Sequence, residues 1–186
     1  MSTVETPVYE WNHLPWRKLE QTVFKLQKQI YRASTRGDSK TTRRLQRLLM
    51  SSWAAKCLAV RRVTQDNRGK KTAGVDGVKS VPPHQRLALV RDLRISPKSR
   101  PVRRMWIPKP GKQERRPLGI PTLRDRAAQT VVRFALEPEW EARFEPNSYG
   151  FRPGRSCHDA IEAIVDAIKQ KACYVLDADI AACLEP

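Results

Sequence analysis

Two aspartates near the C-terminal end of the chain are spaced for metal chemistry. Asp177 and Asp179 lie in the run YVLDADI, whose apolar residues predict a β-strand over residues 173–180. Because residues two apart on a strand face the same side, the two carboxylates repel each other unless a cation or water intervenes. Such oxygen ligands suit Mg²⁺, and two-metal phosphoryl transfer needs a cluster of them. The alternative is that both are ordinary strand-end or turn residues.

A basic turn lies between two strand-like runs, VRRMWIP and RPLGIPT, which together predict a β-hairpin over residues 102–122. Its tip surrounds a glycine with four cations, namely Lys109, Lys112, Arg115 and Arg116. Such a tip could close over a triphosphate, because Arg offers forked donors and Lys a point charge. It could equally be a solubilising β-turn.

The loop YGFRPGRS is a third candidate site. Arg152 and Arg155 alternate there with Gly, Pro and the aromatic residues Tyr149 and Phe151. This arrangement could set an arginine against phosphate or sugar, or it could be a helix-entry loop whose aromatic residues belong to the core. Ser156, which follows, is a typical N-cap for the next helix.

The net charge of +17 is concentrated in one part of the chain of 186 residues. Residues 1–116 hold 28 Lys and Arg against 8 Asp and Glu, a balance of +20, whereas residues 117–186 hold 8 against 11, a balance of −3. A phosphate-rich partner explains this excess better than solubility alone, because neutralising phosphates releases counterions. A basic surface on the membrane is less favoured, since no basic helix also has a strongly apolar face.

The elements that must position these residues are mostly helical. Apolar spacing predicts helices at residues 16–32, 40–63, 83–93 and 123–144. Pro138 is expected to kink or split the last of these. The first two helices have apolar stripes that we expect to be buried, namely Leu19, Val23, Leu26 and Ile30, and Leu45, Leu48, Leu49, Trp53 and Cys57. The long loop 64–83 is rich in Gly, Lys and small polar residues, and loops of this kind are usually functional or disordered. Residues 1–15 are expected to form a flexible arm.

Composition also limits the compartment. No apolar stretch reaches 18 residues and the N-terminus lacks the pattern of a secretory signal, so we expect no membrane partner. The four cysteines show no CxxC spacing, which argues against a disulfide scaffold or a zinc site. A reducing compartment, the cytoplasm, is therefore expected.

These motifs, in this order along the chain, indicate a protein family more specifically than any single motif does. From about residue 11 to 183 the chain resembles the N-terminal part of a group II intron-encoded reverse transcriptase/maturase, a retron-type reverse transcriptase. The matching stretches are WNHLPWRKLEQTVFKLQKQIYRA, AVRRVTQDNRGKKTAGVDGV, RRMWIPKPGKQERRPLGIPTLRDRAAQ, ALEPEWEARFEPNSYGFRPGRSCHDAI and YVLDADI.

The resemblance implies an α+β fold, with an N-terminal helical extension, the fingers subdomain and the first palm strand of a right-hand polymerase. Residues 16–93 would be the extension, with loop 64–83 as a lid-like insertion over the template-primer. Residues 94–172 would be the fingers, and residues 173–186 the first palm strand, truncated before the catalytic Tyr-x-Asp-Asp turn.

The resemblance also implies roles for single residues. Lys109 and Arg116 would contact the phosphates of the incoming dNTP, with Arg115 as the fallback because the turn is one residue longer than in many relatives. Asp179 would be the catalytic Mg²⁺ ligand, with the Ile180 carbonyl beside it. Intron RNA and template would be bound by basic residues, namely Arg43, Arg44, Arg47, Arg61, Arg62, Arg68, Lys70, Lys71, Arg152 and Arg155.

The end of the chain departs from the family pattern. The sequence closes with AACLEP, which puts Leu184 where the family has an aromatic residue and Glu185 where it has an acid, usually Asp. One carboxylate cannot hold two Mg²⁺ ions, so we expect this chain alone to bind RNA without polymerising DNA. A broken gene, an artificially shortened chain or half of a split polypeptide, with palm and thumb supplied in trans, would each explain the pattern. The alternative function is a non-enzymatic basic RNA-binding or interaction protein.

Overall fold

The computed structural model describes residues 10–96, 98, 100–111, 113–169, 174–178 and 180. The chain divides into two compact units, one up to Ala142 and one from Arg143 onward. The first unit combines helices with a two-stranded sheet, and the second contains a helix. Helices and a small sheet together agree with the predicted α+β class in its general form. None of the described helices is long and apolar enough to cross a membrane.

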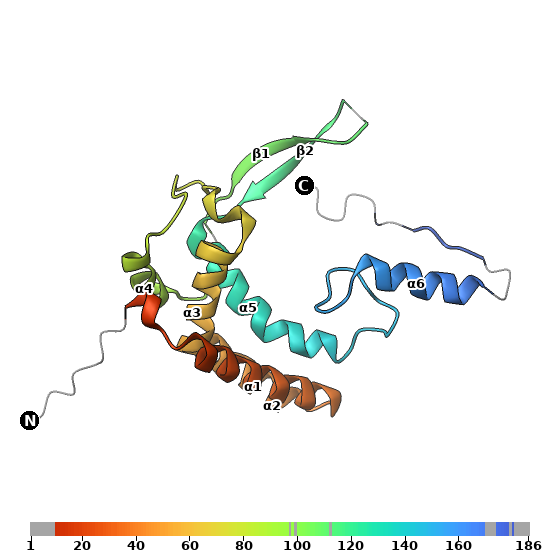
Figure 1. The fold of residues 1–186 in the computed structure, drawn as a ribbon, viewed down its shortest axis with the longest axis horizontal. Helices are drawn as coiled ribbons and strands as arrows, with labels where there is room; N and C mark the ends of the chain where they lie inside the picture. Colours follow the sequence, from red (N-terminus) through yellow and green to blue (C-terminus); the bar gives the residue numbers. More distant parts are fainter. Residues whose placement is uncertain are drawn as a thin grey trace, which may run out of the picture. The chain divides into compact units, whose positions relative to one another are not determined.

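Four helices build the core of the first unit (Figure 1). They are α1 (Trp16–Thr35), α2 (Ser39–Ser51), α3 (Trp53–Arg61) and α5 (Leu123–Glu141). Helix α5 packs against the other three, and α4 (Pro83–Asp92) packs against α3. The predicted stripe of α1 is largely confirmed, because Leu19, Val23 and Ile30 are buried. The side chains that the core encloses completely include Ile30, Leu49, Val60, Val90 and Val131.

The single helix predicted over residues 40–63 is two helices and a further turn. Ser52 has extended backbone angles (φ −62°, ψ 128°), which end α2 and start α3. A π-helical turn, Arg62–Asp66, then follows α3. The boundary between α2 and α3 is formed by the backbone, because the Ser52 N–H donates to the Leu49 carbonyl over 3.0 Å and the Ser52 carbonyl accepts from the Lys56 N–H over 3.1 Å. Leu48 and Trp53, both expected on the buried stripe, are 53% and 42% exposed, and Trp53 directly follows the break at Ser52.

Pro138 neither splits α5 nor ends it, because the helix runs on to Glu141. Proline has no N–H to donate to the carbonyl four residues earlier, which belongs to Phe134. The Nε2 atom of Gln27, on α1, donates to that carbonyl oxygen over 3.1 Å. A neighbouring helix thus satisfies the acceptor that proline leaves open, which allows the helix to continue.

Part of the expected N-terminal arm is ordered. Residues 1–15 were predicted to be flexible, but Trp11–His13 form a 3-10 turn in which Trp11 is buried, and Leu14 is buried as well. The Trp11 and Trp16 rings meet edge to face with centroids 4.9 Å apart. The Nε1 atom of Trp11 also donates to Gln65 Oε1 over 3.0 Å. Residues 1–9 lie outside the described part of the chain.

The predicted hairpin is confirmed. Strands β1 (Arg103–Pro108) and β2 (Arg115–Ile120) pair antiparallel, with Ile107 opposite Arg116 and Pro108 opposite Arg115. The turn needs a glycine at Gly111, where φ is +72°. Figure 1 shows the hairpin projecting from the helices of the first unit. Ile120, at its base, is buried, whereas Trp106 near its middle is 56% exposed.

The second unit contains α6 (Cys157–Ile168), and the predicted cap at Ser156 is confirmed. The Ser156 hydroxyl accepts from the Asp159 N–H, while the Asp159 carboxylate accepts from the Ser156 N–H over 2.7 Å. The strand expected over residues 173–180 is absent from the described residues 174–178 and 180. A strand needs a neighbour to complete its hydrogen bonds, and the described residues offer no strand that pairs with this segment.

Candidate nucleic-acid interface

The hairpin register decides which cations near the tip share a face. Residues opposite each other on an antiparallel pair point to the same side, and each strand alternates its sides. Ile107 pairs with Arg116, and the Lys109 N–H donates to the Glu114 carbonyl just beyond the strands. Lys109 and Arg116 therefore lie on one face of the hairpin. Arg115, opposite Pro108, lies on the other face.

Lys109 and Arg116, near the tip on that face, have different environments. The Lys109 Nζ lies 3.3 Å from the Glu114 carboxylate, across the tip, and its side chain is about one-third exposed. Arg116 is exposed. Because exposed ion pairs contribute only about 0–1 kcal/mol, a phosphate could displace Glu114 from Lys109 at little cost. Lys112, which the sequence also placed at the tip, lies outside the described residues.

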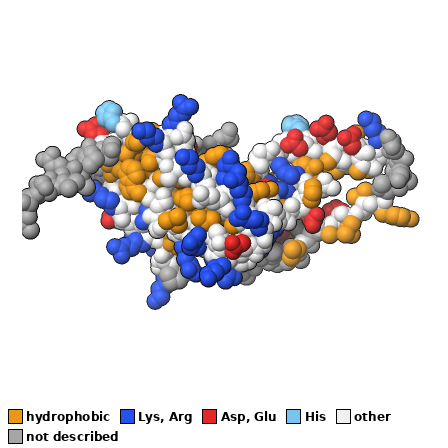
Figure 2. Space-filling model, turned by 90° about the horizontal axis from the view of Figure 1, so that it is seen from below, with side chains coloured by type: hydrophobic (Ala, Val, Ile, Leu, Met, Phe, Trp, Pro, Cys, Tyr) orange, Lys and Arg blue, Asp and Glu red, His pale blue; other side chains and the backbone are white. Residues whose placement is uncertain are grey.

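Helix α2 carries a basic face, formed by Lys40, Arg43, Arg44 and Arg47, all exposed. Its opposite side is buried through Thr42, Gln46 and Leu49. The three- and four-residue spacing of both sets keeps each on its own side of the helix. On the face drawn in Figure 2, Lys and Arg side chains are scattered widely over the first unit, with few acidic side chains among them. The α2 basic face can therefore meet a polyanion without rearrangement.

Arg61 and Arg62 differ from the α2 basic face because both are only half-exposed. The Arg61 guanidinium lies 2.9 Å from the Glu20 carboxylate and 3.6 Å from that of Asp66. It also lies over the Trp16 ring, 4.9 Å from its centroid. Arg61 thus joins α1 to the π-helical turn, and its charge is largely matched locally. Arg62 lies over the Phe134 ring, 6.0 Å from its centroid.

The segment expected as a long loop, residues 64–83, is partly ordered and anchored to α5. Arg68–Lys71 form a 3-10 turn. The Arg126 Nη1 donates to the Gly69 carbonyl over 2.9 Å, and its Nη2 donates to that of Thr72. Gly74 packs so tightly that an added Cβ would lie 2.7 Å from the Thr122 Cα. The side chains of Arg68 and Lys70 lie outside the described part, whereas Lys71 is exposed.

Arg126 is a residue that sequence reasoning missed. Its Nε is buried without a hydrogen-bond partner among the described residues, and burial lowers the pKa of its guanidinium, an effect that Asp76 opposes. Arg126 lies near the start of α5. The two carbonyl groups it binds, of Thr72 and Gly69, lie 54 and 57 residues earlier in the sequence. The only sequence signal is its position in the run RDR at a predicted helix start. That pattern does not predict which distant carbonyl groups the arginine binds.

The loop YGFRPGRS uses its arginines internally. Arg152 is 9% exposed, and its Nη1 donates to the carbonyls of Glu145 and Ser148, each over 2.8 Å. Arg155 donates to the Pro146 carbonyl and lies over the Tyr149 ring, 5.2 Å from its centroid. Both guanidinium groups therefore hold the loop in shape. Their predicted contact with RNA stays a prediction, and we leave Arg152 out of the proposed surface.

The predicted metal site cannot be assembled from the described residues. Asp179 lies outside them, Asp177 is exposed, and Ile180 is 73% exposed. No group of three or more His, Cys, Asp or Glu side chains that could hold a metal ion occurs in the described ranges. These residues do not provide a fit for Mg²⁺, so Asp179 and the Ile180 carbonyl stay predicted ligands.

Comparison with known proteins identifies two successive domains. Residues 11–93 match the N-terminal domain of reverse transcriptase, and residues 107–184 match reverse transcriptase (RNA-dependent DNA polymerase). The chain is therefore similar to reverse transcriptases over both of its described units.

Individual relatives agree with the two domain matches. Protein YkfC of Escherichia coli is 39% identical over 74% of this chain and 39% of its own length. The group II intron-encoded protein LtrA of Lactococcus lactis is 41% identical over 53% of this chain and 17% of its own. Maturase-like protein 1 of Euglena gracilis is 32% identical over 81% of this chain and 33% of its own length. This chain thus spans well under half the length of these relatives. Its two matched domains are those of reverse transcriptases, and its relatives include intron-encoded and maturase-like proteins.

Proposed function

We propose that this chain is the part of an intron reverse transcriptase/maturase that binds RNA and contacts the incoming dNTP. In the complete polymerase, the hairpin 102–122 faces the incoming dNTP, and the first unit holds template or intron RNA. The observation that carries the proposal is the hairpin register, which puts Lys109 and Arg116 on one face, in the segment that matches a reverse transcriptase. The subdomain names extension, fingers and first palm strand belong to this proposal.

The register also ranks the two candidate arginines. A triphosphate bound along one hairpin face meets Lys109 and Arg116 together, while Arg115 points to the opposite face. An arginine fork and a lysine point charge are complementary ways to hold phosphate oxygens. Arg116 is therefore our proposed dNTP contact and Arg115 its built-in control. Mg²⁺ would neutralise phosphate charge in the complete polymerase, with Asp179 as its proposed ligand.

RNA binding is proposed for the α2 basic face, with Arg62 and the exposed Lys71 as neighbours in the first unit. The driving force is counterion release from phosphates, to which the balance of +20 over residues 1–116 contributes. The four scattered cysteines and the buried Cys57, whose thiol pKa burial raises to about 12, suit a reducing compartment. We propose the cytoplasm as the place of action.

The RNA proposal is tested by fluorescence anisotropy of the whole chain with a single-stranded RNA over a range of salt concentrations. Log affinity should fall with log salt, with a slope of about −0.7 for each phosphate contacted. Replacing Arg43, Arg44 and Arg47 with glutamine should flatten that slope by about two units, because three contacts are lost. The matched control replaces Arg91, Arg94 and Arg100, which removes the same charge elsewhere. A flat response for the unaltered chain, or equal effects of the two triple variants, would overturn the proposal.

The nucleotide proposal is tested by adding palm and thumb segments of a group II intron reverse transcriptase in trans and measuring primer extension on an RNA template. Restored synthesis should show a raised KM for dNTP in Arg116→Ala and little change in Arg115→Ala. The reverse ranking would show that the proposed face is wrong. RNA binding without restored synthesis would favour the non-enzymatic RNA-binding protein.

A further inference from the structure

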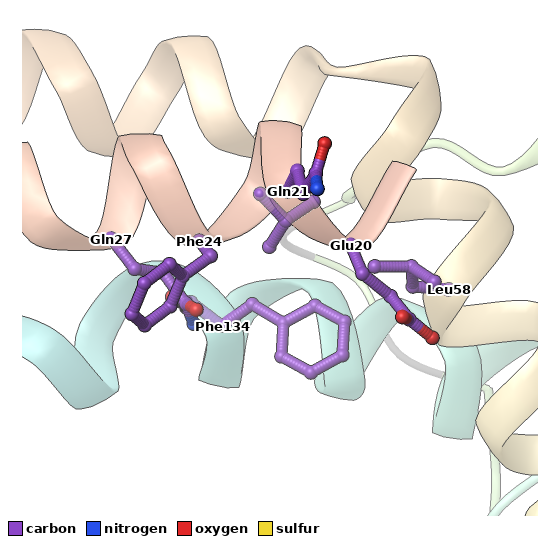
Figure 3. Close-up of a pocket in the computed structure, with 7 residues that line it drawn as sticks. Glu20, Gln21, Phe24, Gln27, Leu58 and Phe134 are labelled. Atoms are coloured by element: carbon purple, nitrogen blue, oxygen red, sulfur yellow. Dashed lines mark hydrogen bonds between the residues drawn. The ribbon is translucent and has the colours of Figure 1, made fainter. Parts of the chain in front are cut away.

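The first unit has an open groove where α1, α3 and α5 meet, shown in Figure 3. Its volume is about 430 Å³, in the range of sites for small organic groups. Val23, Phe24, Gln27, Leu58 and Phe134 line it, so most of its wall is apolar. In Figure 3 the Phe24 side chain comes from α1 and the Phe134 side chain from α5. Phe24 is 60% exposed, which is unusual for so large an apolar side chain on a packed helix.

This groove continues into a second hollow with a different character. The second hollow has a volume of about 400 Å³ and shares Glu20, Leu58 and Phe134 with the first. Its remaining wall is charged or polar, formed by Arg61, Arg62, Asp66 and Asn67. The combined groove thus has an aromatic end and a polar end.

The charges along the groove favour an anionic occupant. The two carboxylates in its wall, Glu20 and Asp66, both face Arg61, at 2.9 and 3.6 Å, which offsets one of their two negative charges. Arg62, over the Phe134 ring, adds a positive charge at the polar end. At the aromatic end the Lys28 Nζ lies 5.6 Å from the Phe24 centroid. An occupant therefore meets two aromatic rings, each with a cation near it, and together with Glu20, Asp66 and Arg61 these cations give the groove a net charge of about +1.

We propose that this groove is a subsite for one unstacked base of single-stranded RNA. The base stacks on the Phe24 ring, and the phosphates on either side of it approach Lys28 and Arg62. Aromatic side chains take any base by its flat face, so a mostly apolar wall predicts weak preference among the four bases. The subsite rests on the proposed RNA binding and adds a stacking contact to it. A protein side chain is the competing occupant, but it does not need the flanking cations.

The test compares Phe24→Ala with Tyr31→Ala in RNA anisotropy titrations of the whole chain. Tyr31 is a matched control, because it lies on α1 and is 47% exposed but does not line the groove. Loss of one stacked base is expected to weaken RNA binding by about 5- to 150-fold in Phe24→Ala. The salt slope should stay unchanged, since no phosphate contact is lost. Phe24→Trp should keep the affinity, and Lys28→Gln should lower the slope instead.

A second probe separates stacking from other causes. An RNA of equal length and charge in which every base is replaced by an abasic unit should bind the unaltered chain and Phe24→Ala equally. If the unaltered chain binds no RNA, the proposed RNA function fails. If it binds RNA and Phe24→Ala matches Tyr31→Ala, or if abasic RNA still distinguishes the variants, RNA binding stands and the base subsite is wrong. Circular dichroism of each variant confirms that the fold is kept.

Discussion

Helices α1 and α6 carry similar apolar stripes but have different surroundings. Both place apolar residues at three- and four-residue intervals, through Leu19, Val23 and Ile30 in α1 and Ile161, Ile164 and Ile168 in α6. In the first unit the stripe is buried by the neighbouring helices. In the second unit no residue of α6 is buried, and its isoleucines are 50–59% exposed. Periodicity therefore marks which side of a helix can be buried, while burial itself depends on a neighbour.

The second unit is stabilised by interactions between residues close in sequence, rather than by packing between helices. Arg152 is the only buried residue among the described positions from Arg143 onward, and it is fastened to carbonyls of its own loop. The Ser156 and Asp159 capping box starts α6 without help from distant residues. A helix stabilised in this way keeps its shape through caps and propensity, which contribute less than packing. The two units should therefore respond very differently to the same kind of substitution.

The largest difference is expected from removing one isoleucine in each unit. Ile30→Ala should lower the free energy of unfolding by about 2–5 kcal/mol, because it leaves a cavity in a fully enclosed position. Ile164→Ala, at 59% exposure, should stay within about 0.5 kcal/mol of the unaltered chain. Urea unfolding followed by circular dichroism measures both. Equal losses would mean that the α6 stripe is covered in solution, and the contrast would be broken.

The anchoring of the 68–72 turn to α5 tests whether irregular backbone in the first unit is also held by packing. Arg126→Met should raise amide hydrogen exchange over residues 68–74 on the order of tenfold, since two charge-assisted contacts are lost. Arg124→Met is the matched control, because Arg124 lies two residues away and donates to the Asp92 carbonyl instead. The same exchange rates in both variants would show that Arg126 does not hold the turn.

A smaller effect is expected where α1 supports the proline in α5. Gln27→Met should cost about 1 kcal/mol of unfolding free energy, because the Phe134 carbonyl loses its donor. In a Pro138→Ala background the restored N–H of residue 138 satisfies that carbonyl, so the same substitution should cost much less. Urea unfolding of the four chains of this double-mutant cycle gives the coupling. Equal costs in both backgrounds would contradict the compensation.

The smallest effect is expected from acid, which should weaken the helix of the second unit before those of the first. The backbone N–H of Ser156, followed by its side chain, lowers the pKa of the Asp159 carboxyl, so the capping box stabilises α6 fully above the ordinary Asp range. That stabilisation is lost as pH falls through the lowered pKa, because the protonated form is less favoured in the folded state. Thr41 likewise lowers the pKa of Asp38 at the start of α2.

Chemical shifts measured by NMR during an acid titration should show helix loss at α6 and not at α2, which the core retains. Asp159→Asn should remove the pH dependence at α6. Parallel loss of both helices would mean that acid unfolds the chain as a whole, and that the local cap is not what distinguishes the second unit.

Several features could be predicted from the sequence because their causes lie within a few residues. The helix starting at Trp16, the hairpin around Gly111 and the cap at Ser156 follow from apolar spacing, a turn glycine and a side-chain acceptor. Five sequence stretches, in the same order along the chain as in the family, were also enough to indicate a reverse transcriptase, which the comparisons confirmed.

The sequence-based errors arose where a distant or missing neighbour decides. Trp53 was expected inside and lies outside, because the backbone turns at Ser52. Pro138 was expected to kink or split its helix, and the split does not occur: Gln27 donates to the Phe134 carbonyl, 107 residues further along the sequence, and α5 continues to Glu141. The strand expected over residues 173–180 is absent from the described part of that range, since strand hydrogen bonds require a partner that local pattern cannot supply.

By itself, the sequence determined the charge distribution, the positions of most helices, the hairpin and the family, because each depends on composition or on neighbours along the chain. Only the tertiary structure decided that Arg116 rather than Arg115 shares a face with Lys109 and that Arg126 anchors the segment 68–72. Only the tertiary structure also left one apolar stripe uncovered while burying another. The physical reason is that hydrophobic burial and long-range hydrogen bonds depend on which surfaces meet in space, and spacing along one helix or strand carries no record of its partner.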